Sequence, residues 1–166
     1  LEQIGIPCLI ENPYWNKTKG EMVSECLDRE ILTELLPLSL SCAHPGIKRF
    51  NHGIPHCGYC LPCIIRKAAI EKAWGKGNDT TDYYLKNLNQ RALDATKAEG
   101  VQVRAFQYAL SKLNANSNLA SLWIHKSGPL TLFPERLSEL IGVYSRGMQE
   151  VDDLLASVMT FSSKAN

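Results

Sequence analysis

The stretch Cys57-Gly-Tyr-Cys60-Leu-Pro-Cys63 places three cysteines at intervals of three residues. A fourth, Cys42, lies fifteen positions upstream among turn-forming residues. Structural zinc sites take four tetrahedral ligands from the protein, and cysteine thiolates are common among them. The short cluster cannot surround a tetrahedral ion without a fourth donor. The spacing therefore predicts a zinc site with four ligands: Cys42, Cys57, Cys60 and Cys63.

Other interpretations of these cysteines stay open. Thiolates also hold iron–sulfur clusters, and a loop histidine could replace Cys42 as the fourth ligand, the candidates being His44, His52 and His56. Disulfides belong to oxidising compartments. The sequence shows no apolar signal segment at its start and no stretch long enough to span a membrane, so we expect a cytoplasmic protein with reduced thiols. Cys8 and Cys26 have apolar neighbours and are expected to be buried thiols.

Composition describes a globular chain without strong charge. Of 166 residues, 45% are hydrophobic and 21% charged, which is enough to form a core in one domain or in a domain and a part. Eighteen Lys and Arg against seventeen Asp and Glu argue against binding of nucleic acid through bulk electrostatics. The chain starts at Leu1 instead of Met, which we interpret as a fragment or a processed form.

The first part of the chain has the pattern of a strand followed by a helix. Residues 4–10 alternate and are apolar on both faces, as expected for a strand in a covered α/β sheet. Thr18 and Glu21 form a capping-box pattern, which predicts a helix that begins at Thr18. Apolar residues then follow at helical spacing until Pro37 ends the helix. Residues 1–36 are thus predicted to contain a strand and a helix of an α/β domain.

After the cysteine segment the pattern is helical almost to the end. One helix opens at Leu61 and is broken at Gly75, and the next is capped by Asp79 or Thr80 and stopped by Gly100. The remaining predicted helices are one around residues 106–113, a short one around 119–123 and a long one from Pro134 to about Met159. Apolar steps of three and four in the last helix indicate a core-facing stripe, with a partner-binding surface as the alternative.

Two separated motifs resemble the QueC-type 7-cyano-7-deazaguanine synthases. The first, Pro13-Tyr-Trp-Asn-Lys-Thr18-Lys19-Gly-Glu21-Met-Val23, is similar to the family's P-x4-T-K-x-E-[IV]-V. The second, Ser41-Cys42 followed by Cys57-Gly58-x-Cys60-x-x-Cys63-x-x-Arg66, is similar to its zinc loop. Order and spacing agree over residues 6–70. The resemblance is closer to the QueC-like group found in phage-defence operons than to the housekeeping enzyme.

The chain also departs from that family. The interval between the first and second cysteines is about twice the family's, and a helical extension follows residue 75. The family's S-G-G-x-D-S loop, which cradles ATP phosphates, is absent. The resemblance therefore implies the C-terminal part of such an enzyme, which should not catalyse alone. It divides the chain into the end of an adenine-nucleotide α-hydrolase-like domain (1–36), a zinc loop (37–66) and a mostly α-helical domain (67–166).

The resemblance implies an ATP-dependent carbon–nitrogen ligase. With magnesium, ATP would adenylate a carboxy-deazaguanine, ammonia would displace AMP to give an amide, and a second activation would give the nitrile. Defence-associated relatives could instead attach a deazaguanine to a protein. Lys19, preceded by Thr18, matches a lysine that contacts ATP phosphates in related pyrophosphatases. Arg66 is expected to neutralise the zinc tetrathiolate or, alternatively, to contact substrate. No catalytic residue is assigned.

A different class of function is a zinc-stapled helical module without catalysis. Its helices could dock a protein partner. Basic and aromatic residues near the cysteines could instead contact RNA, namely Lys48, Arg49, Phe50, Tyr59, Arg66 and Lys67. Salt-dependent binding of tRNA would favour the second version, and capture of a defined protein without ATP turnover would favour the first.

Overall fold

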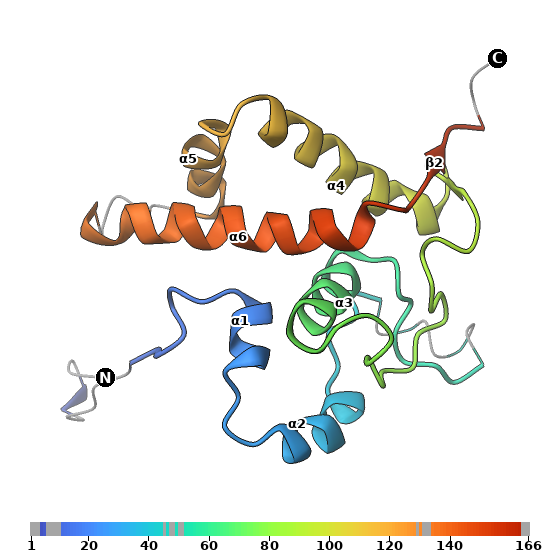
Figure 1. Ribbon diagram of the computed structural model, residues 1–166, viewed down its shortest axis with the longest axis horizontal. Coiled ribbons are helices and arrows are strands. Elements are labelled where there is room, and N and C mark those ends of the chain that lie inside the picture. Colours follow the sequence, from blue (N-terminus) through green and yellow to red (C-terminus); the bar gives the residue numbers. More distant parts are fainter. Residues whose placement is uncertain are drawn as a thin grey trace.

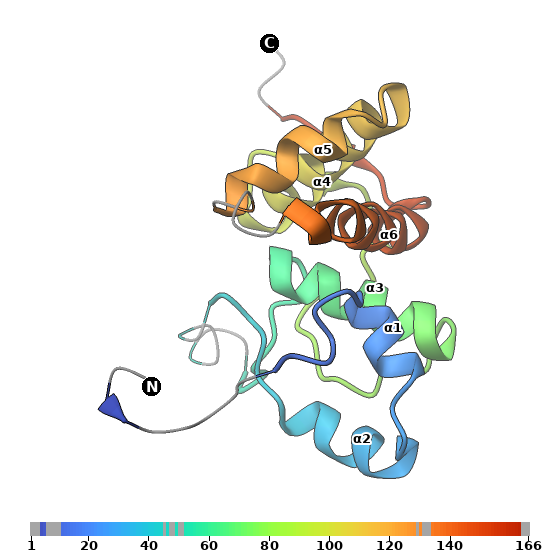
Figure 2. The same cartoon turned by 90° about the vertical axis from the view of Figure 1, so that its left-hand side faces the viewer.

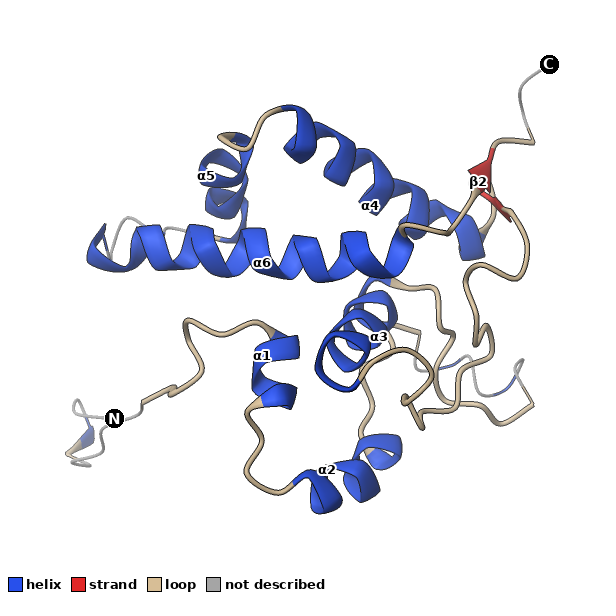
Figure 3. Ribbon diagram, in the orientation of Figure 1, coloured by secondary structure: helices blue, strands red, loops and turns tan. Residues whose placement is uncertain are grey.

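The computed structural model describes residues 4–5, 11–44, 46, 49, 52–128, 130 and 134–163. Helices predominate, and the only sheet in this part of the chain pairs two short strands (Figures 1 and 3). The elements are, in chain order, α1 (Lys19–Ser24), α2 (Arg29–Leu35), η2 (Leu36–Leu38), α3 (Leu61–Trp74), β1 (Leu93–Asp94), α4 (Ala98–Ala115), α5 (Leu119–Trp123), η4 (Ile124–Ser127), η6 (Pro134–Arg136), α6 (Leu137–Leu155) and β2 (Thr160–Phe161).

The helices form two groups that meet along α6. Helices α4 and α6 contact each other, and α5 packs against both (Figure 1). Helix α3 crosses below α6 and contacts α1, so that residues far apart in the sequence lie side by side (Figure 2). Helix α2 lies on the outer side of the second group, which consists of α1, α2 and α3, and is directed away from α4, α5 and α6 (Figure 2). In the described residues, no helix combines the length and apolar character that a membrane span requires.

The main core lies where α3, α4 and α6 meet. Ile64 of α3, Val103 of α4 and Val151 of α6 are almost fully buried there. The apolar stripe of α6 therefore faces the core, as the sequence predicts, but its buried residues are confined to the C-terminal half of the helix: Glu150, Val151 and Leu155.

The helix predicted between Asp79 and Gly100 is wrong, because no helix lies between Trp74 and Ala98. The Asp79 carboxylate accepts hydrogen bonds from the Thr81 N–H and the Tyr83 hydroxyl, which hold a turn in place of a helix cap. Gly100 does not stop a helix but lies inside α4, where a Cβ would overlap the carbonyl group of Asp94. Close packing of α4 on β1 explains this glycine.

The single helix predicted from Thr18 to Pro37 is two helices, α1 and α2. The capping box of Thr18 and Glu21 is present as predicted. The Asp28 side chain then caps α2, accepting from the N–H of Ile31 at 2.9 Å. Aspartate at this position starts a new helix and interrupts the old one. The strand predicted over residues 4–10 falls almost entirely outside the described residues.

The last helix ends at Leu155, four residues before its predicted end. The Met159 carbonyl accepts from the Leu93 N–H at 2.8 Å, and β2 pairs in parallel with β1, Leu93 opposite Thr160. Residues after Ala68 are therefore not all helical. The predicted boundary between residues 66 and 67 lies within α3, which contributes to both the cysteine cluster and the main core.

Candidate metal centre

Four cysteine sulfurs converge at the N-terminal end of α3. Cys57 and Cys60 precede this helix, Cys63 lies in its first turn, and Cys42 comes from the segment after η2. The four Sγ atoms all lie within 4.8 Å of one another, with 3.9 Å between Cys42 and Cys60 and between Cys57 and Cys63. All four side chains are buried and none forms a disulfide. The structure thus brings together the four cysteines singled out in the sequence.

Gly58 allows the tight turn that presents the first two ligands of the short cluster. Its φ is +85°, and a Cβ at this position would overlap the Leu85 carbonyl oxygen. This close approach lets the segment around Leu85 lie against the turn. The carbonyls of His56 and Cys57 accept from the N–H groups of Tyr84 and Leu85 at 2.8 and 3.0 Å. Those bonds fix the cysteine turn against a part of the chain twenty-eight residues later.

Backbone N–H groups point at the sulfurs. Cys60 donates to the Sγ of Cys57 at 3.2 Å, and both Cys57 and His44 donate to the Sγ of Cys42, at 3.5 and 3.4 Å. Cys60 is also the N-cap residue of α3, where the helix dipole is positive. Hydrogen bonds to the ionised form and a positive dipole end both favour thiolates. The surroundings therefore suit deprotonated cysteines.

The close thiols share their protons unequally. The hydrogen bond between the Cys57 and Cys63 sulfurs, which lie 3.9 Å apart, lowers the pKa of Cys57 and raises that of Cys63. Because a metal ligand must be deprotonated, binding of a cation here would release protons.

Lys67 is a buried residue whose positive charge can balance the negative charge of a thiolate cluster. It lies one helical turn after Cys63, and its ammonium group donates to the carbonyls of Leu85 and Lys86 at 2.6 and 2.9 Å. Its Nζ lies 4.3 Å from the centroid of the Tyr83 ring. Burial lowers the pKa of Lys67 to about 8, while the charges of Cys63 and Cys57 act in the opposite direction. From the sequence, Lys67 was named only as a possible RNA contact, although its spacing of four from Cys63 places it on the same helix face.

Arg66 was expected to neutralise the cluster, but its hydrogen bonds go elsewhere. The buried guanidinium donates to the carbonyls of Leu36 and Ser39 and to the hydroxyls of Ser39 and Thr81. It therefore ties the segment that carries Cys42 to α3. This is a structural anchor, whereas the charges of Cys63 and Cys57 act on Lys67.

Histidine is not part of the ligand cluster in the described residues. The Nε2 atom of His56 lies 3.2 Å from the Ser39 carbonyl oxygen, and the ring is fully buried. Burial, followed by the charge of Arg66, lowers the pKa of His56, which favours the neutral form of the ring. Its Nδ1 and the Ser41 hydroxyl are buried without a hydrogen-bond partner in the described part of the chain. Both residues directly precede a cysteine of the cluster.

The donor set fits a tetrahedral metal ion. Zinc–sulfur bonds of about 2.3 Å in a tetrahedron require sulfurs about 3.8 Å apart, and two of the sulfur pairs are 3.9 Å apart. Four thiolates with no open position describe a structural centre rather than a catalytic one. The cluster could therefore hold a metal such as zinc.

Thr18 and Lys19, the predicted phosphate-binding pair, lie at the start of α1, far from the cysteines in sequence. Thr18 is buried and its hydroxyl donates to the Glu150 carboxylate on α6, while accepting from the Glu21 N–H at 3.1 Å. The other Glu150 oxygen accepts from the Gly20 N–H at 3.3 Å. Glu150 was missed because nothing in the sequence links it to a residue 132 positions away. The Thr18 side chain is fully engaged within the chain.

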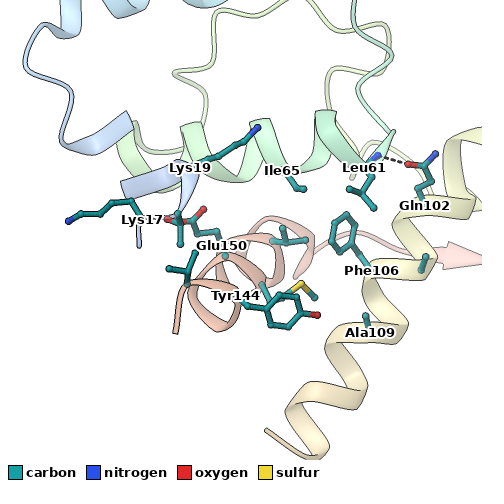
Figure 4. A pocket seen from close by; sticks show the side chains of 15 residues that line it. Lys17, Lys19, Leu61, Ile65, Gln102, Phe106, Ala109, Tyr144 and Glu150 are labelled. Atoms are coloured by element: carbon teal, nitrogen blue, oxygen red, sulfur yellow. Dashed lines mark hydrogen bonds between the residues drawn. The ribbon is translucent and has the colours of Figure 1, made fainter. Parts of the chain in front are cut away.

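Lys19 lies between two cavities. The larger, of about 590 Å³, is enclosed by α1, α3, α4 and α6 and has mostly apolar walls, including Ile65, Phe106 and Tyr144 (Figure 4). The smaller, of about 270 Å³, lies between α1 and the segment around Leu40. Figure 4 shows the Lys19 side chain extending from α1 toward α3, whereas the Lys17 amine turns away from the other labelled groups. Lys17 is paired with Glu25 at 2.8 Å.

Comparisons of this chain with protein-family models, with curated proteins and with solved structures found no match.

Proposed function

We propose that the four cysteines bind one structural zinc ion. The observation that carries the proposal is the convergence of four buried Sγ atoms, all within 4.8 Å of one another, at the start of α3. Zinc would supply a tetrahedral cross-link between segments that share few apolar contacts. Cys42 fastens the segment after η2, Cys57 and Cys60 fasten the turn, and Cys63 fastens α3. Backbone N–H groups and Lys67 offset the negative charge of the thiolates.

Metal analysis of the purified chain tests this proposal. We expect about one zinc ion per chain, as a single four-thiolate site requires. Cys42→Ser should greatly weaken zinc retention, whereas Cys26→Ser is the matched control because Cys26 lies outside the cluster. Iron with visible charge-transfer absorption, or a chain free of metal, would refute the zinc assignment. Full zinc retention by Cys42→Ser would point to a histidine as the fourth ligand.

We further propose that this chain is the C-terminal portion of an ATP-dependent QueC-like ligase that activates a carboxy-deazaguanine, in the context of anti-phage defence. The support is the resemblance of the two motifs, in the right order, and the start of α1 at the Thr18-Lys19 pair. ATP and magnesium would act in the parent protein. The group available to a phosphate is the Lys19 ammonium, because the Thr18 hydroxyl is held by Glu150. Thr18 would position the start of α1.

The parent protein offers the direct test. Given ATP, magnesium and a carboxy-deazaguanine, it should release AMP and pyrophosphate, whereas the 166-residue chain alone should do neither. Lys19→Ala should reduce that release, and Lys17→Ala is the control because the Lys17 ammonium is already paired with Glu25. Unchanged activity of Lys19→Ala would remove the phosphate role. Failure of the intact protein to form AMP with any deazaguanine would remove the ligase proposal and leave the structural zinc centre untouched.

A further inference from the structure

Helix α2 buries none of its own residues. Short helices are marginal in water and usually depend on packing of one face against the rest of the protein. Yet Ile31 and Leu35 on α2 are each 54% exposed. Leu27 before the helix and Leu38 after it are 104% and 79% exposed, so an apolar row continues past both ends of the helix. We call the row Leu27, Ile31, Leu35 and Leu38 the α2 stripe.

The α2 stripe is an additional apolar face, different from the face by which this segment contacts the rest of the protein. On the other side of the same segment, Leu36 is buried, Leu32 is half-buried and the Arg29 guanidinium lies 5.2 Å from the Trp74 ring on α3. These residues anchor α2 to the protein. With 100° per residue, the mean direction of Ile31 and Leu35 is about 130° around the helix from that of Arg29 and Leu36. The contact of Arg29 with Trp74 therefore leaves the α2 stripe without a partner in the described residues.

Exposed apolar side chains are concentrated here. Six of the fifteen large exposed apolar residues of the described chain lie between residues 22 and 40: Met22, Leu27, Ile31, Leu35, Leu38 and Leu40. Apolar patches of this kind mark interaction sites. Steps of four, four and three residues in the stripe match the spacing used between packed helices.

The charged residues of α2 indicate which charge a partner of the α2 stripe should carry. Glu30 and Glu34 lie on one flank of the α2 stripe and are both exposed. The cation of this helix, Arg29, is turned to the opposite face and lies over Trp74. The exposed side of α2 is therefore apolar and acidic. A second copy of α2 would bring like charges together, which opposes self-pairing.

We propose that the α2 stripe binds an amphipathic helix whose apolar row is flanked by Lys or Arg. The apolar row would cover Ile31 and Leu35, and the basic flank would face Glu30 and Glu34. This surface is separate from the cysteine centre and from Lys19, so the proposal does not depend on the ligase function.

Two synthetic helices of about three heptads test it, both with Leu at the core positions. One carries Lys at the flanking positions and the other carries Glu. The Lys helix should bind the chain about tenfold more tightly than the Glu helix, because several weak charge pairs change sign together. The combined change Glu30→Lys and Glu34→Lys should reverse that preference. Equal binding of both helices, or no binding of the Lys helix, would overturn the proposal.

Variants of the stripe separate binding from folding. Ile31→Ser and Leu35→Ser should each weaken binding of the Lys helix about tenfold or more, since each removes an apolar side chain buried in the complex. Both positions are exposed, so the circular dichroism of the free chain should stay unchanged. Leu122→Ser, at a 66% exposed position on α5, is the matched control and should bind normally. A chain that sediments as a dimer, and as a monomer after Ile31→Ser, would assign the stripe to self-association and overturn the proposal.

Discussion

Two buried clusters share helix α3 but are held together by different forces. The main core joins apolar side chains of α3, α4 and α6, including Ile64, Val103 and Val151. The second cluster contains the four cysteines and Tyr83 and has no other buried apolar residue in the described chain. Ile64 and Cys63 are adjacent in sequence, yet one belongs to each cluster. Burial of apolar side chains stabilises the main core. In the cysteine cluster, a bound metal ion or the thiol protons must balance the negative charge of the sulfurs.

The difference extends to the chain around each cluster. Regular helices surround the main core, and their backbone groups bond within each helix. Around the cysteines the chain is mostly irregular, so its backbone groups need other partners. Arg66 and Lys67 supply them by donating to the carbonyls of Leu36, Ser39, Leu85 and Lys86. A few strong polar contacts thus replace a periodic apolar face.

Loss of one cysteine ligand should have the largest effect, and it should affect the cysteine cluster and not the main core. Cys60→Ser leaves three thiolates and should abolish tight zinc binding, because structural zinc contributes about 10 kcal/mol or more to folding in small zinc domains. We expect the amides of Tyr84 and Leu85, which bond to the cysteine turn, to lose protection from hydrogen exchange. The amides of Val103 and Val151 should stay protected. Equal loss of protection in both clusters would show that they fold as one unit and not as two.

A substitution in the main core should show the reverse pattern. Leu155→Ala removes a buried side chain and should lower the free energy of unfolding by about 2–5 kcal/mol in urea denaturation. Leu140→Ala, in the less buried half of α6, should cost about 1 kcal/mol or less. Both variants should retain zinc. A similar cost at the two positions would mean that the N-terminal half of α6 is covered in solution.

The sequence predicted the helices with periodic apolar faces and the ligands with short spacing. Helices α3, α5 and α6, and the core of α4, follow from their apolar steps, from Gly75 as a break and from Pro134 as a helix start. The four cysteines follow from chemistry, since few structures other than a metal site use such spacing. These features depend on residues that are close together in the chain, and such patterns can be recognised in a single sequence.

Long-range contacts decided the rest. The segment 79–97 has apolar residues at helical spacing, but the N–H groups of Tyr84 and Leu85 bond to the carbonyls of His56 and Cys57, which overrides that pattern. The pairing of Leu93 with Thr160 joins residues 67 positions apart, and the Thr18–Glu150 bond joins residues 132 apart. No periodicity in the sequence reports such contacts. The different hydrogen-bond partners of Arg66 and Lys67 likewise depend on where each side chain points on α3.

A pair of glycine substitutions should sharpen the comparison at the boundary between α1 and α6. A Cβ on Gly20 would lie 2.5 Å from the Oε1 of Glu150, whose carboxylate is buried and held by Thr18. Gly20→Ala should therefore cost about 1–3 kcal/mol, as overpacking does. A Cβ on Gly147 would meet only Thr18 Cγ2, at 3.9 Å. Gly147→Ala should stabilise by about 0.5–1 kcal/mol, because alanine favours a helix interior. Thermal unfolding of both variants measures the difference, and the same sign for both would contradict the packing described.

The smallest expected effect concerns the ion pair that joins the two helix groups at the surface. The Arg146 guanidinium donates to Glu21, and this hydrogen bond holds the pKa of that carboxyl below its usual range. A lowered folded-state pKa contributes stability at pH values above about 4.3, and the contribution is lost as the pH falls through the folded-state value. Because the two side chains are 27% and 48% exposed, the loss should be no more than about 1 kcal/mol.

Glu21→Gln keeps a capping side chain at the start of α1 and removes only the charge. In urea titrations at neutral pH and near pH 3, the variant should lose less stability on acidification than the parent chain. Equal acid sensitivity would show that capping, and not the pair with Arg146, holds α1 against α6.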